Sequence, residues 1–391
     1  MRIESAETLT IKQLVLLGAG HTNLQTLLHW CEHPRADTDV TLIYPHEQVV
    51  HPAMLAGLVA GHYQADECSV HLPSLLAGSK VRHLHATATQ IDTTKRVVHT
   101  TQGETRYDFI NIDDATVPDR DAVEARIPGA RANALFVQPP EVFLKLLPQF
   151  LAYASPRALR LAVVADEKHG QQLQYAQTAG AELAMALQHR LPHCHVSFVC
   201  NASPGLQRPL LAALRRLEIT VLQDNCTGIE PGRVALQSGA TLSCDAALLV
   251  TGDTPDEHAP AWLAGSGLAL DAQGCVCGNA YQQSTSHSEV FLATDHKNLR
   301  AMLTDQALRA CPRIKQTLPL ISCGSKRAIA QWGSITCNFA WNVTWMGAVA
   351  WQIKNVRDRR WIRQYLTSPV LASTAQGNSS VHIESNSTKS T

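Results

Sequence analysis

The chain has 391 residues, with 33 Lys and Arg balanced by 33 Asp and Glu. This length exceeds the size at which one hydrophobic core usually stops growing, so we expect at least two domains. The balanced charge gives no overall field that would attract nucleic acid, and no nucleic-acid partner is expected. Hydrophobic residues make up 45% of the chain, a share typical of ordinary globular proteins.

The eleven cysteines indicate buried thiols rather than a disulfide or metal framework. Their one close pair, Cys275 and Cys277, is spaced too tightly for a zinc knuckle. The eighteen histidines are dispersed, so no metal site is expected. No signal peptide precedes the first apolar run, and no stretch of 18 apolar residues occurs. We therefore expect a cytoplasmic chain without a membrane-spanning helix.

The first predicted elements form a strand, a glycine turn, a helix and a second strand. Residues 12–17 are an apolar run suited to a buried parallel strand, and 40–44 are a second one. Between them, Gly18-Ala19-Gly20-His21 opens a helix with regularly spaced leucines. Such a turn lets the backbone approach a pyrophosphate at the helix amino terminus. Because Asn23 replaces the usual third glycine, and no acid ends the second strand, a packing turn explains the motif equally well.

Later segments repeat this pattern. Short antiparallel strands are expected within 81–112 and short strands within 219–250. A second strand-to-helix passage lies within 160–190, which indicates an internal duplication of a nucleotide-binding fold. A helix is expected after Asp295, and the Ser- and Thr-rich residues beyond Pro369 predict a disordered tail.

Residues 49–63 resemble a segment of the flavoproteins fused to selenide, water dikinase and of their stand-alone relatives. Those proteins belong to the type II NADH:quinone oxidoreductase group of the pyridine nucleotide-disulfide oxidoreductase superfamily. Further short motifs fall in the same order as in these relatives, over residues 12 to 366. They are the glycine turn with His21, the helix start at 69–75, Tyr107-Asp108, Ile127-Pro128-Gly129, and the segments 248–252, 265–268, 290–295 and 358–361.

The resemblance implies an α/β fold with two Rossmann-type dinucleotide-binding domains, one for FAD and one for NAD(P)H. It divides the chain into a first part of the FAD domain at 1–130, an inserted NAD(P)H-type domain at 131–252 and a second part of the FAD domain at 253–320. A C-terminal membrane-docking segment at 321–368 and the tail at 369–391 follow.

The resemblance also implies roles for individual residues. Glu182 would be the catalytic residue, facing the reactive end of the flavin and nicotinamide; its structural alternative is a surface charge in a first helical turn. The FAD pyrophosphate turn would be formed by Gly18, Ala19, Gly20 and His21. The hinge between the domains would be formed by Thr251 and Gly252, and the acid at the ribityl-phosphate region would be Asp295.

The second nucleotide turn departs from the family's pattern. Ala165-Asp166-Glu167-Lys168-His169 follows the strand in place of a glycine pair, and the next strand ends in Cys200-Asn201 without a ribose-binding acid. Two carboxylates at this turn would repel a pyrophosphate, and no nearby basic residue beyond Lys168 offsets them. Thr294 and Asp114 also stand where glycines are expected. These departures put NAD(P)H binding in doubt, whereas FAD binding remains expected.

The C-terminal segment predicts a membrane contact. Aromatic and aliphatic residues crowd 339–353, and five basic residues follow: Lys354, Arg357, Arg359, Arg360 and Arg363. This order is typical of a helix lying in a membrane interface, although a helix packed on the protein with a solvated basic face explains it equally well. The resemblance favours docking near a quinone entrance, on the inner face of the cell membrane.

The expected activity is reduction of FAD by a nicotinamide donor and transfer of the electrons to a membrane quinone, with Glu182 handling protons. One alternative is a membrane-associated flavoprotein that has lost its donor site. Another is a sulfide:quinone oxidoreductase that uses Cys323, although 160–190 holds no cysteine to partner it. Cys31 stands alone on the first helix, which argues against a dithiol mechanism. A homodimer is compatible with the sequence.

Overall fold

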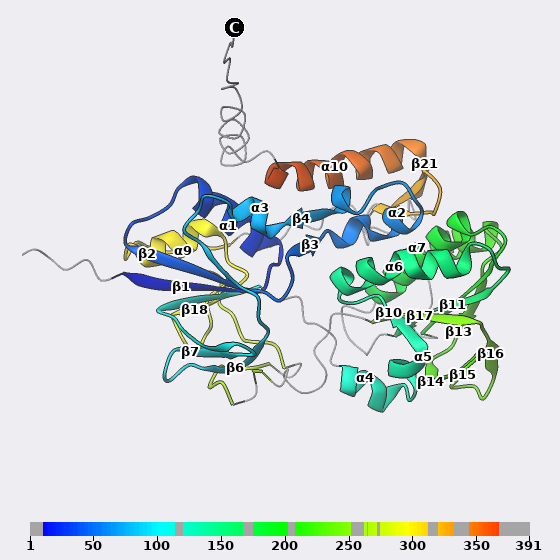
Figure 1. Ribbon diagram of the computed structural model, residues 1–391, viewed down its shortest axis with the longest axis horizontal. Helices are drawn as coiled ribbons and strands as arrows, with labels where there is room; N and C mark the ends of the chain where they lie inside the picture. The colour runs from blue at the N-terminus through cyan, green and yellow to red at the C-terminus, as the bar shows by residue number, and fades with distance from the viewer. Residues whose placement is uncertain are drawn as a thin grey trace, which may run out of the picture.

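The computed structural model describes residues 11–113, 120–166, 175–201, 208–251, 262–263, 265–271, 274–311, 320–331 and 344–366. Two parallel five-stranded sheets form the centres of two lobes, and helix α10 (Ala348–Leu366) lies along the top of both (Figure 1). The predicted tail at 369–391 lies outside the described residues.

The first sheet has the strand order β18-β9-β1-β2-β5, with every pair parallel. Its strands are β1 (Lys12–Leu17), β2 (Thr38–Ile43), β5 (Arg82–Leu84), β9 (Phe109–Ile112) and β18 (Val290–Leu292). Helix α1 (His21–Glu32) connects β1 to β2, and α9 (His296–Leu303) follows β18. Leu14, Leu16 and Leu17 are almost fully buried, as expected for a parallel strand covered on both faces.

The second sheet repeats this arrangement, with the order β10-β17-β11-β12-β13 and only parallel pairs. Its strands are β10 (Ala134–Phe136), β11 (Arg160–Asp166), β12 (His195–Cys200), β13 (Thr220–Gln223) and β17 (Ala246–Thr251). Its helices are α4 (Arg120–Arg126), α5 (Ala130–Asn133), α6 (Pro140–Ala154), α7 (Tyr175–Arg190) and α8 (Arg208–Arg216). The predicted duplication and the α/β class with parallel sheets are thus confirmed.

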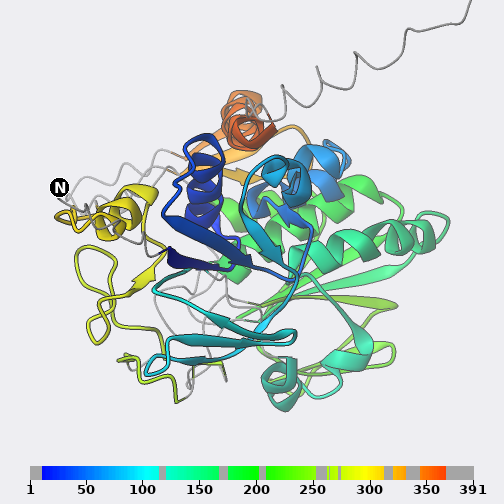
Figure 2. The same cartoon turned by 60° about the vertical axis from the view of Figure 1, so that its left-hand side comes forward.

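A small antiparallel sheet accompanies each parallel one. The first holds β6 (Ala88–Asp92), β7 (Val97–Thr100) and β8 (Gly103–Arg106), and the second holds β14 (Cys226–Glu230), β15 (Arg233–Leu236) and β16 (Thr241–Ser243). The first, coloured cyan, lies below the blue parallel strands in Figure 2. The antiparallel prediction for 81–112 was wrong at its two ends. Strands β5 and β9 pair in parallel with β2 and β1, because the β6–β8 meander turns the chain back along the direction of the first sheet.

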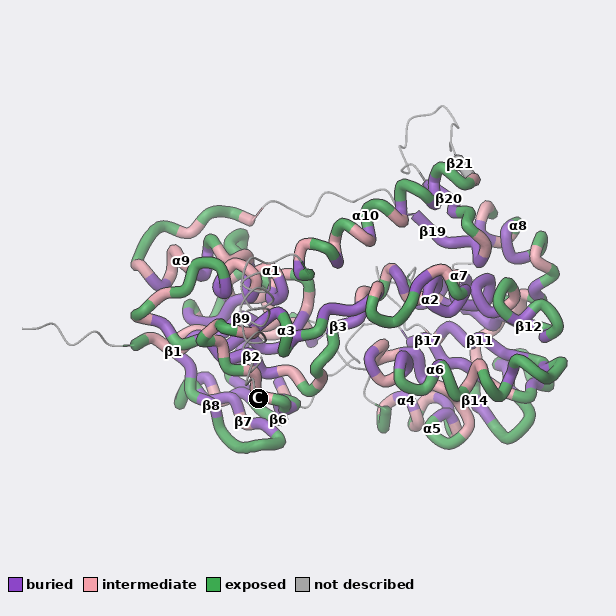
Figure 3. The backbone as a smooth tube through the Cα atoms, turned by 45° about the horizontal axis from the view of Figure 1, so that its top comes forward, coloured by how far each residue is buried: buried purple, intermediate pink, exposed green. Residues whose placement is uncertain are grey.

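The segment that carries the family resemblance bridges the two lobes. It contains β3 (Gln48–Val50), η1 (Pro52–Met54), α2 (Leu55–Val59), η2 (Asp66–Cys68), β4 (Ser69–His71) and α3 (Leu72–Leu76). Helix α2 packs on α7 of the second lobe, and α10 packs on β4 and η2. Strands β3 and β4 pair antiparallel. A third three-stranded antiparallel sheet, β19 (Leu320–Ser322), β20 (Ala328–Gln331) and β21 (Thr344–Gly347), lies beneath the start of α10. Buried and exposed positions alternate along α10 (Figure 3).

A buried amide network holds the β1–α1 turn to the sheet. Asn23 donates through Nδ2 to the carbonyl oxygens of Leu17 and Gly18, at 3.1 and 2.8 Å, and accepts from Asn111 Nδ2 at 2.8 Å. Asn111 Oδ1 in turn accepts the backbone N–H of Thr294 at 3.0 Å. All three side chains are at most 1% exposed. The side chains of Asn23 and Asn111 and the backbone of Thr294 therefore form one network that ties the turn to β9 and to the end of β18.

We predict that Asn111→Ala lowers the free energy of unfolding by about 2 kcal/mol or more, because it leaves buried partners without a hydrogen bond. Urea denaturation followed by circular dichroism measures the loss. The matched control is Gln352→Ala, which removes an exposed amide on α10. Equal stability of the two variants would show that the network contributes little.

Candidate functional site

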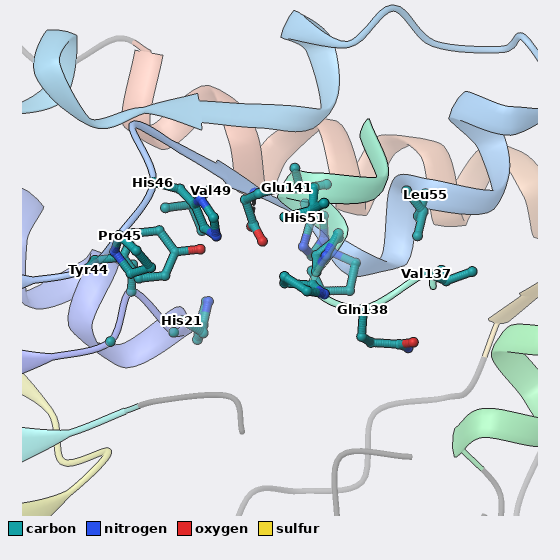
Figure 4. Close-up of a pocket in the computed structure, with 18 of the residues that line it drawn as sticks. His21, Tyr44, Pro45, His46, Val49, His51, Leu55, Val137, Gln138 and Glu141 are labelled. Carbon is teal, nitrogen blue, oxygen red and sulfur yellow. Dashed lines mark hydrogen bonds between the residues drawn. The ribbon is translucent and has the colours of Figure 1, made fainter. Parts of the chain in front are cut away.

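One cavity of about 760 Å³ lies between the lobes, within the range typical of ligand sites. It begins at the β1–α1 turn and ends at α7, with residues of both parallel sheets in its wall. In Figure 4, Tyr44 and His46 lie near His21 at one end, and Leu55 and Val137 lie at the other. Its position between the lobes and its mostly apolar wall suit a ligand with flat ring systems.

The four predicted residues of the turn, Gly18, Ala19, Gly20 and His21, all line this cavity. Gly18 needs to be glycine because its φ of +84° is in the left-handed region, and its N–H donates to the Ile43 carbonyl at 3.0 Å. Gly20 needs to be glycine for a different reason. A Cβ atom at this position would lie 2.3 Å from Oδ1 of Asp113, so the Asp113 carboxylate fills the space beside the turn.

Asp113 satisfies the amino end of α1. Its Oδ2 accepts the backbone N–H of Asn23 at 2.7 Å, and its carboxylate also accepts that of Thr22. Its carbonyl oxygen accepts the N–H of Gly20 at 3.0 Å. Burial raises the pKa of Asp113, while these N–H groups and His21 act in the opposite direction. Three of the N–H groups that a helix terminus leaves open are therefore used by one residue of the chain itself.

Helix α10 closes the cavity beside this turn through Trp361. The indole stacks on the imidazole of His51 with ring centroids 4.1 Å apart, and its Nε1 donates to His21 Nδ1 at 2.5 Å. Burial lowers the pKa of His51 to about 4, although Asp358 favours the charged form. Burial also lowers the pKa of His21, against the attraction of Asp113. Burial therefore favours the uncharged form of both imidazoles facing Trp361.

Glu182 lies at the opposite end of the cavity, on α7. Its Oε1 accepts the backbone N–H of Ser322 at 2.5 Å. Burial raises the pKa of Glu182, against the attraction of Lys354 and the bond from Ser322. Lys354 itself pairs with Asp358 at 2.7 Å in a buried bridge on α10 and also donates to the Ala53 carbonyl. Glu182 lines the cavity, and its predicted role toward the flavin and nicotinamide stays a prediction.

The charges of the cavity wall do not favour a phosphate. Among the described lining residues are three carboxylates, Asp113, Glu141 and Glu182, and the histidines His21, His46 and His51. Burial lowers the pKa of His46 as well. Arg120 is the one Arg or Lys in that described wall. A dianionic ligand would therefore meet several acidic groups and one side chain with a fixed positive charge.

Three of the predicted cofactor-binding residues are not gathered at the described wall. Asp295 caps α9, where its Oδ1 accepts the N–H groups of Lys297 and Asn298 at 3.1 and 3.0 Å. Thr251 is buried in β17, next to Val250, which does line the cavity. Gly252 lies outside the described residues. Their roles toward a cofactor remain predictions.

At the second nucleotide turn, residues 167–174 lie outside the described part of the chain. The expectation that no basic residue other than Lys168 offsets the acids there was wrong for Asp166. Arg126 of α4 pairs with its carboxylate through Nε at 3.1 Å and Nη2 at 2.5 Å. Gly180 has a packing role, because a Cβ there would lie 2.8 Å from the Phe198 ring. It allows α7 to approach β12 closely.

The C-terminal segment faces inward more than the sequence suggested. Trp351 is 7% exposed and packs in a small core with β19 and β20, and Trp361 lines the cavity. Lys354, counted among the basic residues of a docking face, is 4% exposed. The aromatic residues at 339–343 lie outside the described residues. No helix in the described ranges is long and apolar enough to cross a bilayer.

The cysteines of the described ranges are free thiols and include no lining residue of the cavity. Burial, together with the charge of Glu182, raises the pKa of Cys323 to about 11. No cluster of His, Cys, Asp and Glu suited to a metal occurs among the residues that the structure describes.

Sequence reasoning missed Asp113, His51 and Trp361. In the sequence, Asp114, the neighbour of Asp113, stands out only as a missing glycine. Because β9 pairs with β1, however, an acid that directly follows β9 lies beside the β1–α1 turn. Trp361 lies 340 residues from its partner His21. No local pattern marks either contact, because both are set by how β9 and α10 pack on the first lobe.

We predict that Glu182→Gln stabilises the fold increasingly as pH rises above 4.5, the ordinary pKa of this carboxyl. A raised folded-state pKa means that the folded chain holds the proton longer, so wild-type stability falls as pH rises through that interval. The amide oxygen of Gln can still accept the Ser322 N–H. Urea denaturation from pH 4 to 7, with Glu32→Gln as an exposed control, measures the difference. A constant difference between Glu182→Gln and wild type would contradict the burial argument.

No protein-family model and no curated protein sequence matches the chain. Solved structures match it closely in shape. The sulfide:quinone oxidoreductase from the hyperthermophilic bacterium Aquifex aeolicus has a TM-score of 0.70 at 16% identity, with 96% of each chain covered.

Two further structures share the architecture. NDH2 from Plasmodium falciparum, solved in complex with NADH, has a TM-score of 0.61 at 12% identity, with 93% of this chain and 98% of that one covered. The water-forming NADH oxidase from Lactobacillus brevis, bound to NADH, has a TM-score of 0.59 at 16% identity, with 82% and 75% covered. The chain therefore shares its fold with these three proteins, which is the two-lobed architecture that the sequence resemblance predicts.

Proposed function

We propose that this protein is an FAD-dependent oxidoreductase of the NAD(P)H:quinone oxidoreductase type. The observation that carries the proposal is the cavity whose wall includes both the β1–α1 turn of one lobe and Glu182 of the other. In a Rossmann-type fold, such a turn would hold the pyrophosphate of a dinucleotide cofactor. When bound, FAD supplies two-electron redox chemistry that amino-acid side chains lack.

The residues present fit FAD in part. The apolar wall near Tyr44, Leu55 and Val137 suits two flat ring systems, and the glycine turn lies where a Rossmann fold holds a pyrophosphate. Asp113 does not fit, because its carboxylate and its carbonyl oxygen already accept N–H groups that would hold this pyrophosphate. The apolar wall that fits a flavin and the turn that does not fit a pyrophosphate both belong to this cavity.

Glu182 is the group best placed to hold a proton at the inner end. It touches the cavity, its pKa is raised by burial, and the buried Lys354–Asp358 pair lies beyond it. A carboxyl whose pKa is raised holds its proton at higher pH than an ordinary carboxyl, so it can both deliver a proton and take it back. Glu182 therefore supports redox chemistry coupled to proton transfer at this end.

One alternative is favoured by a specific observation. A flavoprotein that has lost its donor reaction explains the acids at the second nucleotide turn. A sulfide-type reaction is less well supported, because Cys323 is buried with its pKa raised to about 11, which disfavours the reactive thiolate.

We predict that the purified protein binds FAD saturably, seen as quenched flavin fluorescence, and that NADH or NADPH bleaches the bound flavin slowly. Anaerobic stopped-flow absorption measures the bleaching, and dithionite gives the complete reduction for comparison. Rapid, saturable bleaching at micromolar nucleotide would show an intact donor site. Failure to bind FAD under any condition would remove the proposed function.

We also propose that the outer face of α10 contacts the membrane that holds the quinone. This face presents Val349, Ile353 and Val356, which are 54%, 49% and 63% exposed, followed by exposed Arg357, Arg360 and Arg363. The inner face is fixed to the protein, so the helix lies along the surface rather than across a bilayer (Figure 3). Apolar residues followed by arginines suit an anionic lipid surface.

We predict that replacing Val349, Ile353 and Val356 together by Ser weakens binding to vesicles of anionic phospholipid at least about tenfold, since it removes the apolar area available for insertion. Flotation of the full-length protein measures binding. The matched control replaces Leu146 and Tyr153, exposed apolar residues of α6, by Ser. Equal flotation of both variants and wild type would exclude this face of α10.

A further inference from the structure

We propose that Asp113 is the affinity-determining residue of the cavity: its carboxylate occupies the pyrophosphate position at α1, and a dinucleotide binds only by displacing it. This inference rests on the proposed function, because it concerns the same cavity. In the free protein, the Asp113 carboxylate keeps phosphates out of the turn. The residue that sets the affinity therefore lies at the end of β9, outside the glycine motif.

The hydrogen bonds support this occupancy. A dinucleotide pyrophosphate is held by backbone N–H groups at the start of the first helix. In this protein, the N–H groups of Thr22 and Asn23 go to the Asp113 carboxylate and that of Gly20 goes to its carbonyl oxygen. An incoming phosphate must therefore break these bonds before it can form its own.

The space beside Gly20 gives a second, independent argument. The Asp113 carboxylate lies so close that even a Cβ atom on Gly20 would come within 2.3 Å of it. The absence of a side chain at position 20, which in a Rossmann turn admits a ligand's phosphate, here admits the carboxylate. If a Gly20 variant lost its flavin, the new side chain could have displaced either the flavin itself or the Asp113 carboxylate. A Gly20 variant therefore does not distinguish these two causes.

Electrostatics act in the same direction. The charged and titratable groups facing Asp113 are His21 at the start of α1 and Tyr365 of α10, while Arg120 of α4 lines the same cavity. Arg120 is the one among them that carries a fixed positive charge. A pyrophosphate placed beside an ionised Asp113 would meet a like charge at hydrogen-bonding distance, which disfavours its binding strongly in a partly buried site.

Two variants separate charge from volume. Asp113→Asn keeps an oxygen that can accept the Asn23 N–H but removes the charge, and Asp113→Ala removes both charge and volume. The matched control is Asp224→Ala, which removes a carboxylate that accepts two backbone N–H groups, of Asn225 and Ser238, away from the cavity wall. The probes are FAD, followed by fluorescence quenching, and ADP, followed by calorimetry, both with flavin-free full-length protein.

We expect Asp113→Ala to bind FAD and ADP at least about tenfold more tightly than wild type, with Asp113→Asn in between and Asp224→Ala unchanged. Tighter binding of ADP without any binding of FAD would support the role of Asp113 and remove the flavin function. Strong FAD binding by wild type that Asp113→Ala leaves unchanged would overturn the inference and retain the function. Weaker binding of both ligands by Asp113→Ala would also overturn it, because Asp113 would then be a ligand contact.

Discussion

The amino end of helix α1 is the constraint on which the site depends. A helix begins with N–H groups that no residue of the helix can accept, and in a buried turn they require partners. In this protein the chain supplies them through Asp113 at the end of β9. Because β9 pairs with β1 on one side and β18 on the other, the position of Asp113 is fixed by the sheet. The Asn23–Asn111–Thr294 network beneath it holds the same three segments together.

Helix α10 relates the two ends of the cavity. Trp361 contacts His21 and His51 at one end, Asp358 lies 4.0 Å from Nε2 of His51, and Lys354, which pairs with Asp358, lies near Glu182. These residues lie on the inner face of one helix whose outer face is apolar and then basic. Any movement of α10 on contact with a surface would therefore change the contacts of Trp361 at the turn and the position of Lys354 near Glu182. The arrangement makes the helix a structural part of the site as well as a candidate docking surface.

Much of the fold could be predicted because it depends on local patterns. Apolar runs predicted the parallel strands β1 and β11, and the repetition of the strand-to-helix pattern predicted the duplication of the nucleotide-binding fold. The pairing direction of β5 and β9 was missed, since a short strand carries no mark of the sheet it joins. The site was predicted only at the glycine turn and Glu182, where a residue type is required by local geometry or by the resemblance. Asp113, Trp361 and the Arg126–Asp166 pair depend on contacts between residues distant in sequence, which spacing cannot reveal.

The most direct test of the central claim is a pair of crystal structures at high resolution, of the free protein and of the protein soaked with FAD. The account predicts that the Asp113 carboxylate contacts the Asn23 N–H in the free protein. In the complex it predicts that the carboxylate has moved and that the pyrophosphate has taken its place. A complex in which the pyrophosphate binds at the turn while Asp113 keeps its position would contradict the account.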